Sequence, residues 1–134
     1  MKKCPKCKEE KPLSLFYKNK SRKDGLSRVC KKCKSEHEQK LLKEAKKWYN
    51  EWKSQQGCFK CGEKRPYCLD LHHTDNRREG DNSRLLSRII SSGTSSLKSR
   101  QNKILAEAKH CIILCANCHR EAHWLENQQK KEVK

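Results

Sequence analysis

The chain has 134 residues, of which 33% are hydrophobic, and it carries 33 Lys+Arg against 16 Asp+Glu for a formal net charge of +17. A chain of this length forms one domain or two very small ones, and so few apolar residues exclude a large hydrophobic core. No segment approaches the roughly 20 apolar residues that span a bilayer, so we expect no membrane partner.

Ten cysteines offer another source of stability. Eight of them fall in Cys-x-x-Cys pairs, the spacing at which one turn presents two thiolates to zinc. Met1-Lys2-Lys3 runs straight into Cys4 without the apolar stretch of a signal peptide. We therefore expect zinc binding in a reducing, intracellular compartment rather than a disulfide framework. The pairs are Cys4 and Cys7, Cys30 and Cys33, Cys58 and Cys61, and Cys115 and Cys118.

Residues 1–33 predict a zinc ribbon. The first two cysteine pairs enclose 22 residues, which include an apolar run at 13–17 and a Lys23-Asp24-Gly25 turn. This arrangement is typical of two zinc knuckles and a short hairpin, with Phe16 or Tyr17 covering the metal.

The same segment is the most basic part of the chain. It holds 12 Lys+Arg against 3 acids, a net charge of +9. This exceeds what solubility needs, so we interpret the ribbon as a phosphate-contacting module. Its candidate DNA-binding residues are Arg28, Lys31 and Lys32.

Residues 34–56 predict an amphipathic linking helix. There is no Gly or Pro from Ser35 to about Gln55, and Gly57 marks the end. The aromatic stripe on this helix is suited to packing on a neighbouring module or a second subunit, or to stacking on bases, and we favour packing. A homodimer through residues 35–55 stays open. Apolar residues recur at helical spacing at Leu41, Leu42, Ala45, Trp48, Tyr49 and Trp52.

Residues 57–134 predict a second module that begins at a zinc knuckle, with Gly62 in its tight turn. Alternation and helical periodicity predict strands at 69–72 and 112–114 and helices at 83–90, 97–109 and 117–129. A charged loop at 74–80 and a flexible break at 91–96 separate them.

A second set of metal donors is imidazole. The last predicted helix places His119 and His123 four residues apart on one face, and His72-His73 ends a predicted strand. Four cysteines satisfy a closed zinc site, whereas imidazole suits metals with open positions. A closed structural metal site beside a metal site with open coordination positions, in a chain of charge +17, points to hydrolysis of a polyanion.

These motifs together resemble the HNH endonuclease family, in its ββα-metal form built on a treble-clef zinc site. The resemblance covers roughly residues 57–125, and residues 1–33 look like the zinc ribbon of small phage-type HNH proteins. It implies a small, zinc-stabilised α+β fold with a ribbon at 1–33, a linking helix at 34–56 and a nuclease module at 57–134, in the cytoplasm of a bacterium or phage-infected host. The matching segments are Cys58-x-x-Cys61, 69–73 and 114–119 with His123.

The resemblance also implies the chemistry. The expected activity is metal-dependent hydrolysis of phosphodiester bonds in DNA, most simply duplex DNA, by nicking or double-strand cleavage. His72, His119 and His123 would hold one catalytic Mg²⁺, Mn²⁺, Ni²⁺ or Zn²⁺, and two structural Zn²⁺ would occupy the cysteine quartets. His73 would be the general base, and Arg120 would hold a flanking phosphate.

One position departs from the family pattern. The family's middle Asn, which positions the base, falls on His110 in this chain. His110 would orient His73, add a metal ligand or be inert, and these alternatives stay open. Asn117 lies between zinc-binding cysteines and is not that residue. Cys68 and Cys111 belong to neither quartet, and we expect both to be small buried hydrophobes.

Two other classes compete with the nuclease. A catalytically inactive double-zinc DNA-binding protein would share the cysteines and the charge. A zinc nucleobase deaminase needs His-x-Glu and Pro-Cys-x-x-Cys, whereas Thr74 follows the histidine pair and Leu114 precedes Cys115, which argues against that class.

Overall fold

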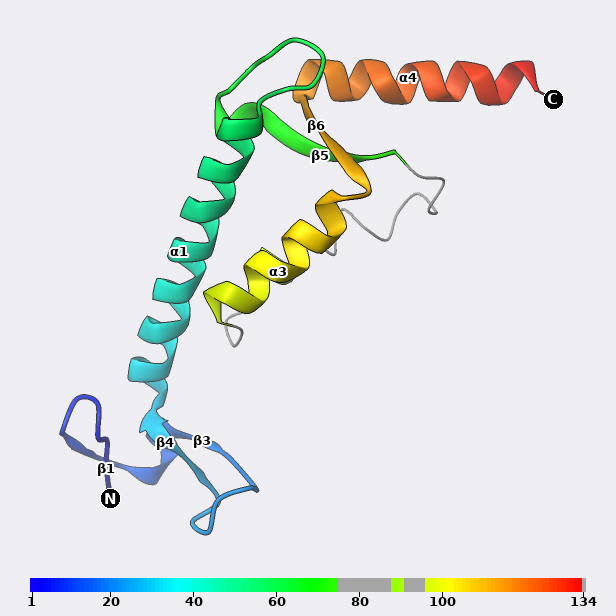
Figure 1. The fold of residues 1–134 in the computed structure, drawn as a ribbon. Helices are drawn as coiled ribbons and strands as arrows, with labels where there is room; N and C mark the ends of the chain where they lie inside the picture. The colour runs from blue at the N-terminus through cyan, green and yellow to red at the C-terminus, as the bar shows by residue number, and fades with distance from the viewer. Residues whose placement is uncertain (75–87, 91–95, 134) are drawn as a thin grey trace.

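A long helix connects the two halves of the molecule (Figure 1). The computed structural model describes residues 1–74, 88–90 and 96–133. Its described part is a small α+β fold with three two-stranded antiparallel sheets. The predicted loop at 74–80 and break at 91–96 lie almost wholly outside the described residues. Of the predicted helix at 83–90 only residues 88–90 are described, and they are helical.

The N-terminal half consists of two pairs of short strands joined by a 3-10 turn. β1 (Lys2–Lys3) pairs with β2 (Glu10–Lys11), a 3-10 turn η1 (Leu13–Leu15) follows, and β3 (Phe16–Lys18) pairs with β4 (Leu26–Cys30).

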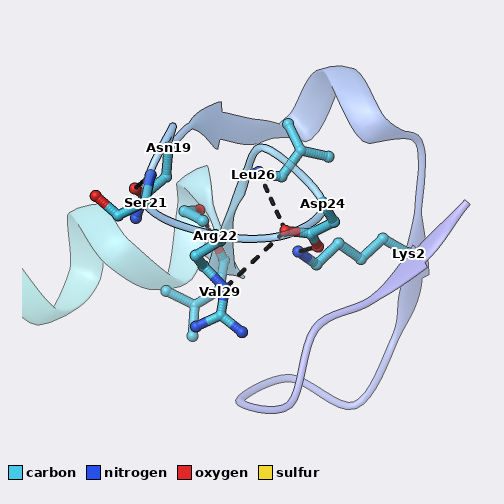
Figure 2. A network of polar contacts seen from close by, with 8 residues as sticks. Lys2, Asn19, Ser21, Arg22, Asp24, Leu26 and Val29 are labelled. Atoms are coloured by element: carbon cyan, nitrogen blue, oxygen red, sulfur yellow. Dashed lines mark hydrogen bonds and ion pairs between the residues drawn. The ribbon is translucent and has the colours of Figure 1, made fainter.

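The predicted turn at 23–25 joins β3 to β4. Gly25 adopts a φ of 66°, which glycine tolerates best, and its carbonyl accepts from the Asn19 N–H at 2.7 Å. Figure 2 shows Asp24 between the Lys2 ammonium and the Leu26 N–H, with both of which it is hydrogen-bonded. The contact with Lys2 holds the pKa of Asp24 below its ordinary value. The turn is thereby tied to the first strand.

Helix α1 (Lys31–Gln56) starts earlier than the sequence predicts. Cys30 has an extended conformation and precedes the first turn, so Cys33 of the ribbon lies inside the helix. The helix therefore begins three residues before the segment predicted at 34–56, because the second Cys-x-x-Cys pair of the ribbon continues directly into it. The end at Gly57 is confirmed: its N–H donates to the Lys53 carbonyl at 2.9 Å.

The second half is built on one hairpin. A 3-10 turn η2 (Pro66–Cys68) leads into β5 (Leu69–His73), which pairs with β6 (Cys111–Cys115) in a register that sets His73 opposite Cys111. Helix α3 (Leu97–Ala108) precedes β6, and α4 (Ala116–Glu132) follows it without a loop. The predicted strands at 69–72 and 112–114 and the predicted helices at 97–109 and 117–129 are confirmed, with each end within three residues of the prediction.

The core of this half lies between the hairpin, the knuckle and the end of α1. Trp52 packs against it and stacks on Trp48 and Tyr49, each at 6.1 Å between ring centroids. The favoured interpretation of the aromatic stripe, packing on a neighbouring module, is confirmed for Trp52, while the homodimer stays a prediction. The buried residues of this core are Cys58, Leu69, Ile113, Leu114 and Cys115.

Two basic side chains are buried where the helices meet their neighbours. Lys53 donates from Nζ to the carbonyls of Pro66 and Leu69 at 3.0 and 2.9 Å, which joins α1 to the start of the hairpin. Arg100 on α3 donates from Nη1 to the Leu41 carbonyl on α1 at 3.2 Å. The Arg100 contact joins α3 to α1 where the two helices lie side by side (Figure 1).

Among the described residues, no helix carries an apolar stretch long enough to cross a membrane.

Candidate metal centres

The four ribbon cysteines form one cluster. Their Sγ atoms all lie within 4.8 Å of one another, and Cys4, Cys30 and Cys33 are buried. Phe16 is buried among them, whereas Tyr17 is 45% exposed, so Phe16 is the residue that covers the cluster.

The second quartet joins distant parts of the chain. Cys58 and Cys61 come from the knuckle after α1, and Cys115 and Cys118 come from the junction of β6 and α4. The four Sγ atoms again lie within 4.8 Å of one another, and those of Cys61 and Cys115 are 3.6 Å apart. A tetrahedral zinc with Zn–S bonds of about 2.3 Å separates its sulfur ligands by about 3.8 Å. Both quartets therefore fit a structural zinc ion.

The first Cys-x-x-Cys pair of each quartet has the same type of backbone turn. The first of these turns is at Cys4 and Cys7, and the second is at Cys58 and Cys61. In the second, Gly62 donates to the Cys58 carbonyl at 2.9 Å and has a φ of 77°. In the first, Lys8 donates to the Cys4 carbonyl at 2.8 Å with a φ of 63°, a conformation that costs a non-glycine residue about 1–2 kcal/mol. The prediction that Gly62 lies in the tight turn of the second module is confirmed, and Lys8 takes the equivalent strained conformation in the ribbon.

Backbone donors surround the thiols. The Cys30 N–H contacts the Cys4 Sγ at 3.4 Å and, with the Cys7 N–H, lowers the pKa of Cys4 to about 6. Burial, together with contacts from neighbouring cysteine side chains, raises the pKa of Cys33 to about 12. Four packed thiols therefore do not all ionise by themselves, and a divalent cation bound there would supply the charge that holds them as thiolates.

Three imidazoles converge beside the second quartet. His72 comes from β5, and His119 and His123 come from successive turns of α4. Their ring centroids lie 4.7–5.1 Å apart, and the Nε2 atoms of His119 and His123 are 3.0 Å apart. Burial and the two neighbouring imidazoles lower the pKa of His119, which favours the neutral ring that binds metals.

The cluster is closed on one side and open on the other. His72 is 7% exposed, whereas His123 is exposed. One donor atom from each of the three rings lies within 4.8 Å of the other two, a spacing that suits one cation. Three protein ligands leave coordination positions for water or substrate. The predicted ligands are thus brought together in an arrangement that can hold a reactive metal.

Carboxylates adjoin this cluster, and the sequence did not reveal them. Glu126 Oε1 lies 2.9 Å from His72 Nε2, and Glu126 Oε2 lies 3.4 Å from His123 Nδ1. Asp70 Oδ2 lies 3.7 Å from His119 Nδ1. Glu126 follows His119 by seven residues and lies on the same face of the helix. This spacing in the sequence could have predicted that Glu126 lies near the histidines.

His73 lies in a different group of side chains. Its Nε2 is 2.8 Å from Glu107 Oε1, and the Cys111 Sγ lies within 4.8 Å of a donor atom of each of these two residues. The His110 carbonyl accepts from the Thr74 N–H at 3.0 Å and from Thr74 Oγ1 at 3.2 Å, while the orienting role of the His110 side chain stays a prediction. Cys68 and Cys111 are half-buried, so the expectation that both are buried is wrong.

The candidate DNA-binding residues lie at two ends of the molecule. Arg28, Lys31 and Lys32 are exposed near the start of α1, and Arg120 is exposed on α4 next to His119. Lys31 also donates from Nζ to the Ser14 carbonyl at 2.8 Å, so it has a structural partner. The structure does not bring the ribbon residues to the histidine cluster, because α1 separates them (Figure 1).

Comparisons of the chain with protein-family models, with curated proteins and with solved structures give no match.

Proposed function

We propose that this chain is a metal-dependent endonuclease of the HNH type that hydrolyses phosphodiester bonds in duplex DNA, with 57–134 as its nuclease module. The observation that carries the proposal is the convergence of His72, His119 and His123 beside a closed cysteine quartet. A closed metal site anchors the fold, and an open one is suited to chemistry. The charge of +17 supplies attraction for a polyanion.

In this proposal the three clustered histidines would hold one Mg²⁺, Mn²⁺, Ni²⁺ or Zn²⁺. A divalent cation bound there would stabilise the charge that develops on the scissile phosphate and on the leaving 3′ oxygen. His73 takes a proton from a water molecule, the resulting hydroxide attacks phosphorus, and the bond from phosphorus to the 3′ oxygen breaks. Solvent protonates the leaving oxygen, so the products carry a 5′ phosphate and a 3′ hydroxyl.

Exposed basic residues place the substrate. Arg120 follows the ligand His119 on α4 and is exposed, so it can contact a phosphate next to the one that is cleaved. The ribbon, with Arg28, Lys31 and Lys32, contacts a second stretch of backbone. Helix α1 has 26 residues and is about 39 Å long, so the two contact regions suit roughly one turn of duplex.

A catalytically inactive double-zinc DNA-binding protein is the second candidate, because both cysteine quartets and the basic ribbon fit it equally well. The histidine cluster favours the nuclease. A DNA-binding protein has no need of three converging imidazoles.

Comparison of the parent chain with His73→Ala in a plasmid-nicking assay with added Mn²⁺ separates the two candidates. We expect the variant to be slower by about 10² to 10⁴, the usual effect of removing a general base, and to bind DNA with unchanged affinity. His37→Ala, an exposed change on α1, is the matched control and should nick at the parent rate. Equal rates for all three chains would show that His73 is not the base. Binding without nicking by the parent would support the inactive protein.

A further inference from the structure

We propose that Glu107 is a positioning residue for His73: its carboxylate holds the imidazole as the Nε2–H tautomer, so that Nδ1 is the atom that accepts the proton of the attacking water. The proposal rests on the proposed nuclease function. It assigns to Glu107 the task that the sequence left open at His110.

The hydrogen bond itself fixes the tautomer. His73 Nε2 and Glu107 Oε1 are 2.8 Å apart, and their side chains are 18% and 12% exposed. An ionised carboxylate only accepts hydrogen bonds, so the ring nitrogen that contacts it carries the proton. In a neutral imidazole the other nitrogen then holds the lone pair, and Nδ1 is left as the basic atom.

The backbone holds both partners in register. Glu107 lies in the last turn of α3, and its carbonyl accepts from the His110 N–H at 3.0 Å in the turn that leads into β6. His73 is paired with Cys111 across the hairpin, and Thr74 donates to the His110 carbonyl. The segment from 107 to 111 is therefore fastened to the end of β5 at His110 and Cys111, and Glu107 is joined to His110 within it. A carboxylate on such a frame restricts the imidazole more than one on a free loop would.

A further metal ion is the competing explanation, because the Cys111 Sγ lies within 4.8 Å of a donor atom of each of the other two residues. The direct contact between His73 and Glu107 favours the hydrogen bond. A metal ion held by Glu107, Cys111 and His73 would bind the lone pair of His73 Nε2, so that this nitrogen would carry no proton.

The first measurement is the ¹⁵N chemical shift of the His73 ring in the full chain with its zinc bound. We expect a protonated Nε2 and an unprotonated Nδ1, and a mixture of tautomers in Glu107→Ala. The Nδ1–H tautomer in the parent, or a His73 spectrum that Glu107→Ala leaves unchanged, would overturn the proposal. A third tightly bound zinc that Cys111→Ser removes would overturn it as well.

The second measurement is the rate of plasmid nicking at saturating Mn²⁺. Glu107→Ala should be slower by about 10-fold to 100-fold, the scale of a misplaced catalytic group. Glu107→Gln, which keeps an acceptor oxygen of the same reach, should recover part of that loss. The Mn²⁺ concentration for half-maximal rate should not change, because Glu107 is not a ligand of the histidine cluster. Glu44→Ala, an exposed change on α1, is the control.

Two outcomes separate this proposal from the proposed function. In the first, the Nε2–H tautomer depends on Glu107, but the chain never nicks DNA. This result would overturn the proposed nuclease function and with it the role of His73 as a base. Nicking that Glu107→Ala leaves at the parent rate would overturn only the positioning role. Elemental analysis of each variant, with two zincs expected, excludes loss of the fold as the cause of a slow rate.

Discussion

Glu126 contacts two of the three clustered histidines, and this position makes it an orienting group for the proposed cation site. Its two oxygens lie 2.9 Å from His72 Nε2 and 3.4 Å from His123 Nδ1, so the carboxylate would orient both rings and add negative charge beside a bound cation. Glu126→Ala should weaken Mn²⁺ binding by about 10-fold to 100-fold, measured by calorimetry on the zinc-loaded chain. Glu132→Ala, exposed near the end of the same helix, should bind Mn²⁺ as the parent does. Equal affinities in both variants would remove Glu126 from the site.

The residues of the candidate site differ in how far the sequence could reveal them. The eight paired cysteines and the His119 and His123 pair were predictable, because their spacing is set by one turn of backbone. The contact between Glu107 and His73 was not predictable, since 34 residues separate the two in the sequence. Such a contact depends on how α3 meets the hairpin, and no local pattern records it. Phe16 and Tyr17 could not be separated either, because the bulge between Phe16 and Lys18 decides which side chain faces the cysteines.

At the scale of elements, Lys53 joins α1 to the hairpin that carries His72 and His73. Its ammonium satisfies two carbonyls, those of Pro66 and Leu69, and lies 4.6 Å from the centre of the Tyr49 ring. Burial lowers the pKa of Lys53, so part of the benefit of these contacts is offset by the cost of desolvating the charge. Lys53→Met leaves both carbonyls without this donor and should destabilise the fold by about 1–3 kcal/mol in thermal unfolding.

Lys47→Met is the matched control for this change. Lys47 is exposed on the same helix, and its pairing with Glu51 at 4.0 Å contributes little, so the change should alter stability by no more than about 0.5 kcal/mol. If both substitutions had the same effect, the connection between α1 and the hairpin would not depend on Lys53.

The elements themselves were largely predictable, and their junctions were not. Periodicity located α1, α3, α4 and both strands of the hairpin, because each has one apolar face. The start of α1 was misplaced, since the second Cys-x-x-Cys turn of the ribbon and the first helical turn share Cys33. Propensity alone places a helix start at a capping residue, whereas here a cysteine precedes the helix.

The whole molecule should depend on two zinc ions, because its two small cores are built around the cysteine quartets. Elemental analysis after brief chelation should give about two zincs per chain, with any third cation exchangeable. Cys115→Ser should lose one zinc, whereas Cys68→Ser, outside both quartets, should retain two. One zinc or none in the parent would contradict the two-quartet account.

The charge of the whole chain predicts a steep salt dependence of DNA binding. If Arg28 and Lys32 contact phosphates, the double variant Arg28→Gln with Lys32→Gln should reduce the slope of log K against log salt by about 1.8, at roughly 0.9 per contact. Lys43→Gln with Lys46→Gln removes the same charge from exposed positions on α1 and should change the slope less. Identical slopes in the two double variants would show that the ribbon makes no special contact.

The most direct test of the nuclease proposal is the rate at which the zinc-loaded parent chain nicks supercoiled plasmid as Mn²⁺ is added. One cation held by His72, His119 and His123 predicts a rate that rises from near zero and saturates as for a single site. His119→Ala should shift that curve to higher Mn²⁺ without removing either zinc. A parent chain that binds plasmid, retains two zincs and leaves it supercoiled at every Mn²⁺ concentration would contradict the account.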